Sequence, residues 1–217
     1  MDKATLLKTL TETRAAWEAL LAQIDEEQMQ RPGAAGTWSV KDVIAHVTWG
    51  ESEIAPVLCT HVLAGSDLWN LSDEERNELT YQQNKDRPLH DIVNEERQAY
   101  TALLAAVQTL SEEDLHAPHR FKNMPQEWSP WQLIAGNSFK HYEDHMRSLR
   151  EWLAKKKEEM NTREHPPDDL QAPMSIELAT LTNAVKKQSG GLRVATQRFF
   201  ISLYLDQLFR ESRTYTT

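Results

Sequence analysis

The sequence has a single cysteine, few glycines and no long apolar run. The lone Cys59 excludes a disulfide within the chain, which makes the cytoplasm the default compartment. Only 7 glycines among 217 residues, and few β-branched runs, favour helices over strands. Because no stretch of about 18 consecutive apolar residues is present, the sequence predicts no membrane span. The first residues already form an amphipathic pattern and lack the apolar core of a signal peptide.

The charge is one-sided. A formal net charge of −9 disfavours nucleic acid as a main partner. The acidic excess lies before residue 176, whereas residues 176–217 carry 6 basic and 3 acidic side chains. With 40% hydrophobic and 26% charged residues, the composition is otherwise typical of a soluble globular protein.

Apolar residues recur with the 3.6-residue period of an amphipathic helix in four long segments. The predicted helices cover about residues 2–25, 39–58, 89–110 and 129–157. The second has a capping-box pattern at Ser39 and Asp42, and its Pro56 predicts a kink or an end. The long connection 64–90 is predicted to be helical around 72–84, and connections of this length often serve as a lid or a pocket wall.

The chain divides into three predicted segments. Residues 1–157 are predicted to form an all-α bundle, and residues 158–173, rich in proline and charge, a linker. Residues 174–217 are predicted to form a C-terminal helical extension that packs on the bundle or on a second subunit. A homodimer is therefore one candidate assembly.

The two halves of the bundle resemble each other. Trp17-Glu-Ala-Leu-Leu-Ala is echoed by Tyr100-Thr-Ala-Leu-Leu-Ala, and Trp38-Ser-Val-Lys-Asp-Val-Ile-Ala by Trp128-Ser-Pro-Trp-Gln-Leu-Ile-Ala. This internal repeat predicts a four-helix bundle with a pseudo-two-fold axis. The helices at 39–58 and 129–157 then occupy equivalent places.

Both of these equivalent helices carry histidines. His141 and His145 are four residues apart, so their side chains share one helix face, which is the minimal helical half of a metal site. Two partly exposed histidines with no ligand show the same spacing. Because the equivalent helix carries His46, the repeat predicts that the three imidazoles meet across the bundle. Three neutral imidazoles with open coordination positions suit a divalent metal ion (zinc, nickel or ferrous iron) that acidifies a bound water.

A carboxylate lies near the middle of the second apolar stripe. Glu51 is costly there unless it is paired, hydrogen-bonded or bound to a metal, which makes it a candidate general base or partner of the metal site. A small rotation of the helix would instead bring it to solvent. Trp38, Trp49 and Trp128 are candidate pocket walls, although each taken singly is better explained as an aromatic that packs in the core or under a loop.

Several pieces in order resemble the DinB-like superfamily of four-helix bundles and, within it, the ClbS/DfsB family. The matching pieces, spread over about residues 3–155, are Gly36-Thr-Trp-Ser-Val-Lys-Asp-Val-Ile-Ala-His46-Val, Asp86-Arg-Pro-Leu, Leu110-Ser-Glu-Glu-Asp-Leu115 and Trp131-Gln-Leu-Ile-Ala-Gly-Asn-Ser-Phe-Lys-His141-Tyr-Glu-Asp-His145. The resemblance implies an up-down-down-up bundle and a metal triad of His46, His141 and His145. The extension beyond about residue 158 has no recognised counterpart.

What the resemblance implies about function is broad. The superfamily includes isomerases and transferases that use mycothiol or bacillithiol, and the ClbS/DfsB family includes a resistance protein that hydrolyses an electrophilic cyclopropane. The first hypothesis is therefore a metal-dependent hydrolase or thiol S-transferase that acts on a small electrophilic molecule, in detoxification or self-resistance. The second is a bundle that binds and sequesters a small molecule without chemistry, and the third an interaction protein that uses the basic tail.

Overall fold

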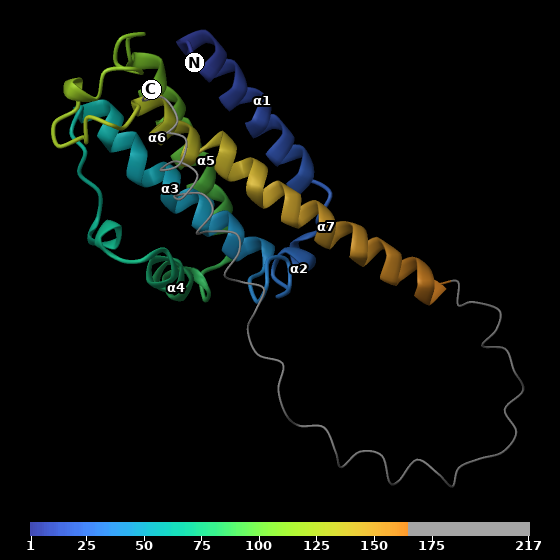
Figure 1. Cartoon of the computed structure of the whole chain (residues 1–217). Helices are drawn as coiled ribbons and strands as arrows, with labels where there is room; N and C mark the ends of the chain where they lie inside the picture. The colour runs from blue at the N-terminus through green and yellow to red at the C-terminus, as the bar shows by residue number, and fades with distance from the viewer. Residues whose placement is uncertain (165–217) are drawn as a thin grey trace, which may run out of the picture. The chain divides into compact units, whose positions relative to one another are not determined.

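The computed structural model describes residues 1–164 of the chain, and these residues form helices joined by loops (Figure 1). The helices are α1 (Lys3–Leu21), α2 (Glu26–Met29), α3 (Val40–Thr60), η1 (Asp67–Asn70), α4 (Asp73–Asn84), α5 (Leu89–Thr109), η2 (Pro118–Arg120), α6 (Pro130–Gly136) and α7 (Phe139–Glu164). The part of the chain that the structure describes contains no strand, only two isolated bridges. This confirms the all-α prediction, with α1, α3, α5 and α7 as the long helices of the bundle.

Residues 1–153 form one compact unit, and the described residues 154–164 belong to a second. Helix α7 continues through residues 158–164, where the sequence predicted a linker. The rest of that predicted linker and the predicted extension 174–217 lie outside the described residues. None of the helices within residues 1–164 combines the length and the apolar character needed to cross a membrane.

Helix starts follow the local sequence closely. Ser39 accepts from the backbone of Asp42, whose carboxylate accepts in return from the backbone of Ser39, so the predicted capping box opens α3. A second capping box, from Ser72 and Glu75, opens α4 inside the long connection. Helix α3 also runs through Pro56 to Thr60, so this proline does not end the helix.

The predicted helix 129–157 is two helices, and this corrects the sequence analysis. Between α6 and α7, the side chains of Asn137 and Ser138 donate to the backbone carbonyls of Leu133 and Ile134, at 2.9 and 2.6 Å. Side chains that bond back to the preceding turn compete with helical hydrogen bonds. The chain tightens there to bonds between residues three apart before α7 begins.

The interior consists of two apolar clusters that follow one another along the bundle. One cluster includes Leu6 and Leu10 of α1, Ile54 and Leu58 of α3, and Leu103 of α5. The other includes Trp17 and Leu20 of α1, Val43 and Val47 of α3, Ile92 of α5, and Tyr142 and Met146 of α7.

Along each long helix, residues of one apolar cluster give way to residues of the other, and a layer of buried polar groups lies at this change. It takes one residue from each long helix: Arg14 from α1, Glu51 from α3, Glu96 from α5 and Tyr142 from α7. Arg14 forms an ion pair with Glu96 through both Nη atoms, and Arg14 Nη1 also donates to the Tyr142 hydroxyl at 3.0 Å. Tyr142 in turn donates to Glu51 Oε1, so one hydrogen-bonded chain joins the four helices.

Burial decides the protonation state of Glu51. Arg14 is the layer's cation, and it is held by Glu96, which also accepts from Trp17 Nε1 at 2.9 Å. Burial raises the pKa of Glu51 to about 8, against the lowering effect of the Tyr142 hydrogen bond and of Arg14. Glu51 is therefore protonated at neutral pH, and the layer carries no net charge.

Loss of the cation should destabilise the bundle strongly. Arg14→Met leaves Glu96 buried without its partner, which typically costs about 3–5 kcal/mol. Urea unfolding followed by circular dichroism should show this loss, with a smaller loss for the double variant Arg14→Met/Glu96→Leu because no charge remains buried. Lys8→Met, which removes an exposed ion pair with Glu12, is the control. Equal unfolding midpoints for Arg14→Met and the control would contradict the assignment.

The raised pKa of Glu51 predicts a pH dependence of stability with a definite sign. The folded state keeps this proton up to about pH 8, whereas the ordinary value is 4.5, so its contribution is full below pH 4.5 and is lost as pH rises toward 8. Each pKa unit corresponds to about 1.4 kcal/mol. The unfolding free energy of the wild type should fall relative to Glu51→Gln between pH 5 and 8, measured in urea with EDTA present. Parallel pH profiles would show that Glu51 is not protonated in the folded state.

Candidate metal centre

Three histidines from two helices converge in the bundle. His46 lies on α3, and His141 and His145 lie one turn apart near the start of α7. One ring nitrogen of each lies within 4.8 Å of those of the other two. The Nε2 atoms of His46 and His141 are 2.9 Å apart, and the three ring centroids lie 4.7 to 5.2 Å from one another. The structure thus brings together all three residues that the sequence nominated.

A glycine of α3 lies next to His141 of α7. Gly50 of α3 lies against this histidine: a Cβ there would be 3.5 Å from His141 Nδ1 and 3.4 Å from Asn137 Oδ1. Asn137 lies in the break between α6 and α7. Gly50 of α3 therefore contacts α7 at this break. The sequence analysis missed both features.

The donor set fits a divalent ion. Bonds of about 2.0–2.1 Å to imidazole nitrogen place tetrahedral ligand atoms roughly 3.3 Å apart, a value that the observed separations of 2.9 to 4.8 Å bracket. The opposite nitrogens, Nδ1 of His46 and of His141, are buried without a hydrogen-bond partner. The Nε2 atoms of His46 and His141, 2.9 Å apart, face one another, as a shared ligand would require.

The electrostatics keep these imidazoles in the form that binds metals. Burial, then His145 and Arg76, lower the pKa of His46 to about 3. Burial lowers the pKa of His145 to about 4, and burial with the two neighbouring histidines holds the pKa of His141 well below its ordinary value. The rings stay neutral at physiological pH, and each is half-buried, so the cluster remains open on one side.

An aromatic pair, Trp38 and Tyr81, begins next to His46. The Trp38 ring lies 5.3 Å from the His46 ring, and Tyr81 of α4 stacks on Trp38 at 6.2 Å. Trp49, one turn after His46, is covered by the guanidinium of Arg76 of α4. Of the predicted wall residues, Trp38 therefore lies beside the cluster and Trp49 is one helical turn from His46, whereas Trp128 packs against the other apolar cluster. Sequence reasoning missed Arg76 and Tyr81; its general expectation that the 64–90 connection lines a pocket was the available signal.

Glu51 has different neighbours from those expected for a base at the metal. It is fully buried, and the groups that act on its pKa are Tyr142, Arg14 and Glu96, none of them a histidine of the cluster. Its second oxygen, Oε2, is buried without a hydrogen-bond partner. The structure places Glu51 in the polar layer, and its role as general base stays a prediction.

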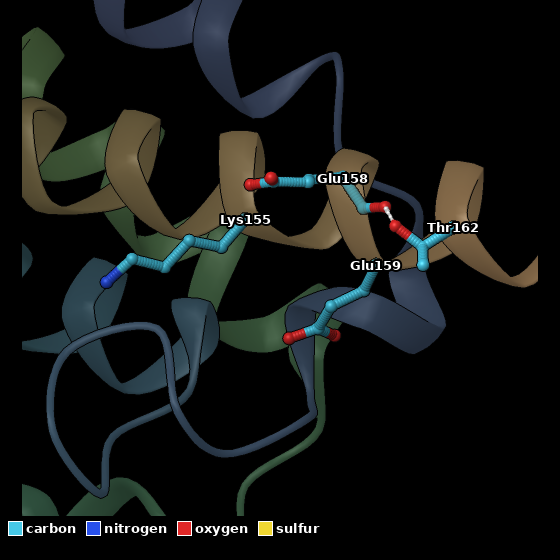
Figure 2. Close-up of a pocket in the computed structure, with 4 residues that line it drawn as sticks. All are labelled: Lys155, Glu158, Glu159 and Thr162. Carbon is cyan, nitrogen blue, oxygen red and sulfur yellow. Dashed lines mark hydrogen bonds between the residues drawn. The ribbon is translucent and has the colours of Figure 1, made fainter. Parts of the chain in front are cut away.

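A hollow on the surface of α7 is lined by Lys155, Glu158, Glu159 and Thr162 (Figure 2). Its four side chains are exposed, and the Thr162 hydroxyl donates to the Glu158 backbone carbonyl at 2.9 Å. Because all four residues come from consecutive turns of one helix and include no histidine or cysteine, this surface offers no set of metal ligands comparable to the histidine cluster.

Solved structures share this architecture at low sequence identity. A protein from Streptococcus pneumoniae matches with a TM-score of 0.60 and 17% identity, over 71% of this chain and 91% of its own. An uncharacterised protein from Escherichia coli UTI89 matches with a TM-score of 0.60 and 14% identity, over 72% and 95%. The protein described as sibling lethal factor precursor DfsB matches with a TM-score of 0.60 and 19% identity, over 72% and 97%. No curated protein matches significantly.

The sequence itself matches a known family over residues 10–135, which is more than half of the chain. This match includes His46 and ends before His141 and His145. The helical architecture of the solved structures agrees with it. The chain belongs to the family of the mycothiol maleylpyruvate isomerase N-terminal domain, within the DinB-like superfamily of helical proteins.

Proposed function

We propose that this chain is a metal-dependent enzyme of the ClbS/DfsB type, in which an activated nucleophile attacks a small electrophilic molecule, in detoxification or self-resistance. The observation that carries the proposal is the meeting of three neutral, half-buried imidazoles from α3 and α7. A structural cluster of histidines in an apolar bundle would bury them fully or give each ring nitrogen a partner. Here the rings are half-buried, and the Nε2 atoms of His46 and His141 face one another at 2.9 Å.

His46, His141 and His145 would hold the ion. A bound zinc, nickel or ferrous ion with open positions supplies Lewis acidity, which makes a water or a thiol nucleophilic near neutral pH. The chain itself keeps the three imidazoles unprotonated through burial, so no proton competes for their ligand nitrogens. Trp38 and Trp49 shield one side of the cluster and provide apolar surface for a substrate.

Two nucleophiles remain candidates. The family's description names a mycothiol-dependent isomerase, which favours a low-molecular-weight thiol. The resemblance to the ClbS/DfsB family, whose member DfsB shares this fold, favours water. Both versions use the same three histidines, and only the second reactant differs.

Metal binding should depend on the three histidines. Untagged wild-type protein should retain about one equivalent of divalent metal after dialysis, and His145→Ala should lose most of it because two imidazoles hold the ion weakly. The measurement is elemental analysis by mass spectrometry. His116→Ala, at an exposed histidine in the 110–117 loop, is the matched control. Equal metal content in wild type and His145→Ala would rule out the triad.

Turnover should distinguish the two nucleophiles. We expect the metal-loaded protein to consume a small epoxide such as styrene oxide, either in buffer alone if water attacks or only with added mycothiol or bacillithiol if a thiol attacks. Loss of a partner that only orients a metal ligand commonly costs 10–100-fold, so His141→Ala should lower the rate by more than about 100-fold. Chromatographic analysis separates diol from thioether. Metal retention without either product, over a panel of electrophiles, would favour the sequestering bundle.

A further inference from the structure

The two ring nitrogens of His141 have different surroundings. Nε2 lies 2.9 Å from His46 Nε2, whereas Nδ1 lies beside Gly50 of α3 and is buried without a hydrogen-bond partner. A neutral imidazole that offers the lone pair of Nε2 to an ion or a donor must carry its proton on Nδ1. The hydrogen bond that Nδ1 makes therefore decides whether Nε2 is free to act as a ligand.

The side-chain amide of Asn137 places an acceptor near this nitrogen. Its Nδ2 donates to the Leu133 carbonyl at 2.9 Å, which leaves Oδ1 as the end of the amide that can accept another bond. The place where a Cβ on Gly50 would stand is 3.4 Å from Asn137 Oδ1 and 3.5 Å from His141 Nδ1. An amide oxygen and a ring nitrogen thus border the same small space on α3.

Gly50 is the residue that leaves this space free of side-chain atoms. It lies in the middle of α3 without a positive φ, where alanine would favour the helix by about 0.5–1 kcal/mol. A Cβ at 3.4 and 3.5 Å from its neighbours would also be in ordinary contact and would not clash. Neither backbone conformation nor packing requires a glycine here. The space itself, between a donor and an acceptor, accounts for it.

A water molecule suits this space. His141 Nδ1 makes no direct hydrogen bond with Asn137, although both atoms lie close to one point. Polar groups separated in this way are routinely joined by one water, which accepts from the first and donates to the second. A methyl group on residue 50 would occupy the same place and would exclude the water.

We propose that Asn137 and Gly50 position His141 as a metal ligand, through a water that is held against the bare Cα of Gly50, accepts the Nδ1–H of His141 and donates to Asn137 Oδ1. The bridge keeps the proton on Nδ1 and directs the lone pair of Nε2 into the histidine cluster. The inference rests on the proposed function for the role of Nε2 as a ligand. Asn137 and Gly50 act through His141 and are positioning residues.

A role of Asn137 in the helix break alone predicts something different. That role uses the amide N–H, which bonds to the Leu133 carbonyl, whereas the proposed bridge uses the amide oxygen. Asn137→Asp keeps an oxygen acceptor and loses the N–H donor, and Asn137→Ala loses both. A difference between these two variants therefore isolates the contribution of the oxygen.

The tautomer of His141 in metal-free protein is the first readout. Nuclear magnetic resonance of the full chain with isotope-labelled histidine shows at neutral pH which ring nitrogen carries the proton, and His141→Ala assigns the signals. Wild type and Asn137→Asp should hold the proton on Nδ1. Gly50→Ala and Asn137→Ala should give a mixture of both tautomers, because Nδ1–H loses its acceptor.

Zinc affinity is the second readout. Loss of the partner of a ligating histidine typically weakens metal binding by about 10–100-fold, so Gly50→Ala and Asn137→Ala should each fall in this range. Asn137→Asp should bind zinc at least as tightly as wild type. Competition with a chromogenic chelator measures these affinities. The thermal midpoint of metal-free Gly50→Ala should equal or exceed that of wild type, since alanine favours the helix.

Ser52→Ala is the matched control, because it changes an exposed residue of α3 two positions after Gly50. It should leave the tautomer and the zinc affinity unchanged. A Gly50→Ala protein with the wild-type tautomer and zinc affinity would overturn the inference. Equal behaviour of Asn137→Asp and Asn137→Ala would also overturn it and would assign Asn137 to the helix break alone.

The two readouts separate this inference from the proposed function. If the wild type binds no zinc while the tautomer of His141 still follows Gly50 and Asn137, the positioning stands and the metal-dependent enzyme fails. If every variant binds zinc as the wild type does and keeps its tautomer, the positioning is rejected and the metal centre stands.

Discussion

The buried ion pair of Arg14 and Glu96 is the constraint on which the other packing depends. A charge buried in an apolar bundle is tolerated only with a partner at hydrogen-bonding distance, so α1 and α5 have one favourable axial register. The Tyr142 hydroxyl accepts from Arg14 and donates to Glu51, which extends the same restriction to α7 and α3. Apolar contacts alone tolerate sliding by a turn; this layer does not.

The axial register that the polar layer imposes on α3 and α7 also fixes where their histidines lie along the bundle. Tyr142 directly follows His141 on α7, and Glu51 lies five residues after His46 on α3. When Tyr142 meets Glu51, His141 is brought level with Gly50 and within reach of His46. The polar layer thus positions the candidate metal centre without contributing a ligand to it. This arrangement gives the buried carboxyl of Glu51 a structural role in the bundle.

The two helices that the internal repeat makes equivalent differ in continuity and in the number of histidines they carry. Helix α3 is continuous through Pro56, whereas the equivalent segment breaks at Asn137 and Ser138 before α7 begins. The histidines are likewise unequal, one on α3 and two on α7. The long 64–90 connection folds α4 over the α3 side of the cluster and brings Arg76 beside Trp49. One face of the centre is therefore histidine-rich, and the neighbouring face is aromatic and cationic.

Local features were readable from the sequence because they depend on neighbours a few residues away. The amphipathic period located the long helices, Ser39 and Ser72 marked helix starts, and the four-residue spacing of His141 and His145 together with the repeat nominated His46. Other features depend on how helices pack, and only the tertiary structure decided them. Apolar periodicity could indicate that Glu51 points into the bundle, but not that its partner would be Tyr142. The length of the 64–90 connection likewise does not say where Arg76 lies. Contacts between distant segments follow from the balance of burial, charge pairing and backbone geometry over the whole bundle, which no local pattern contains.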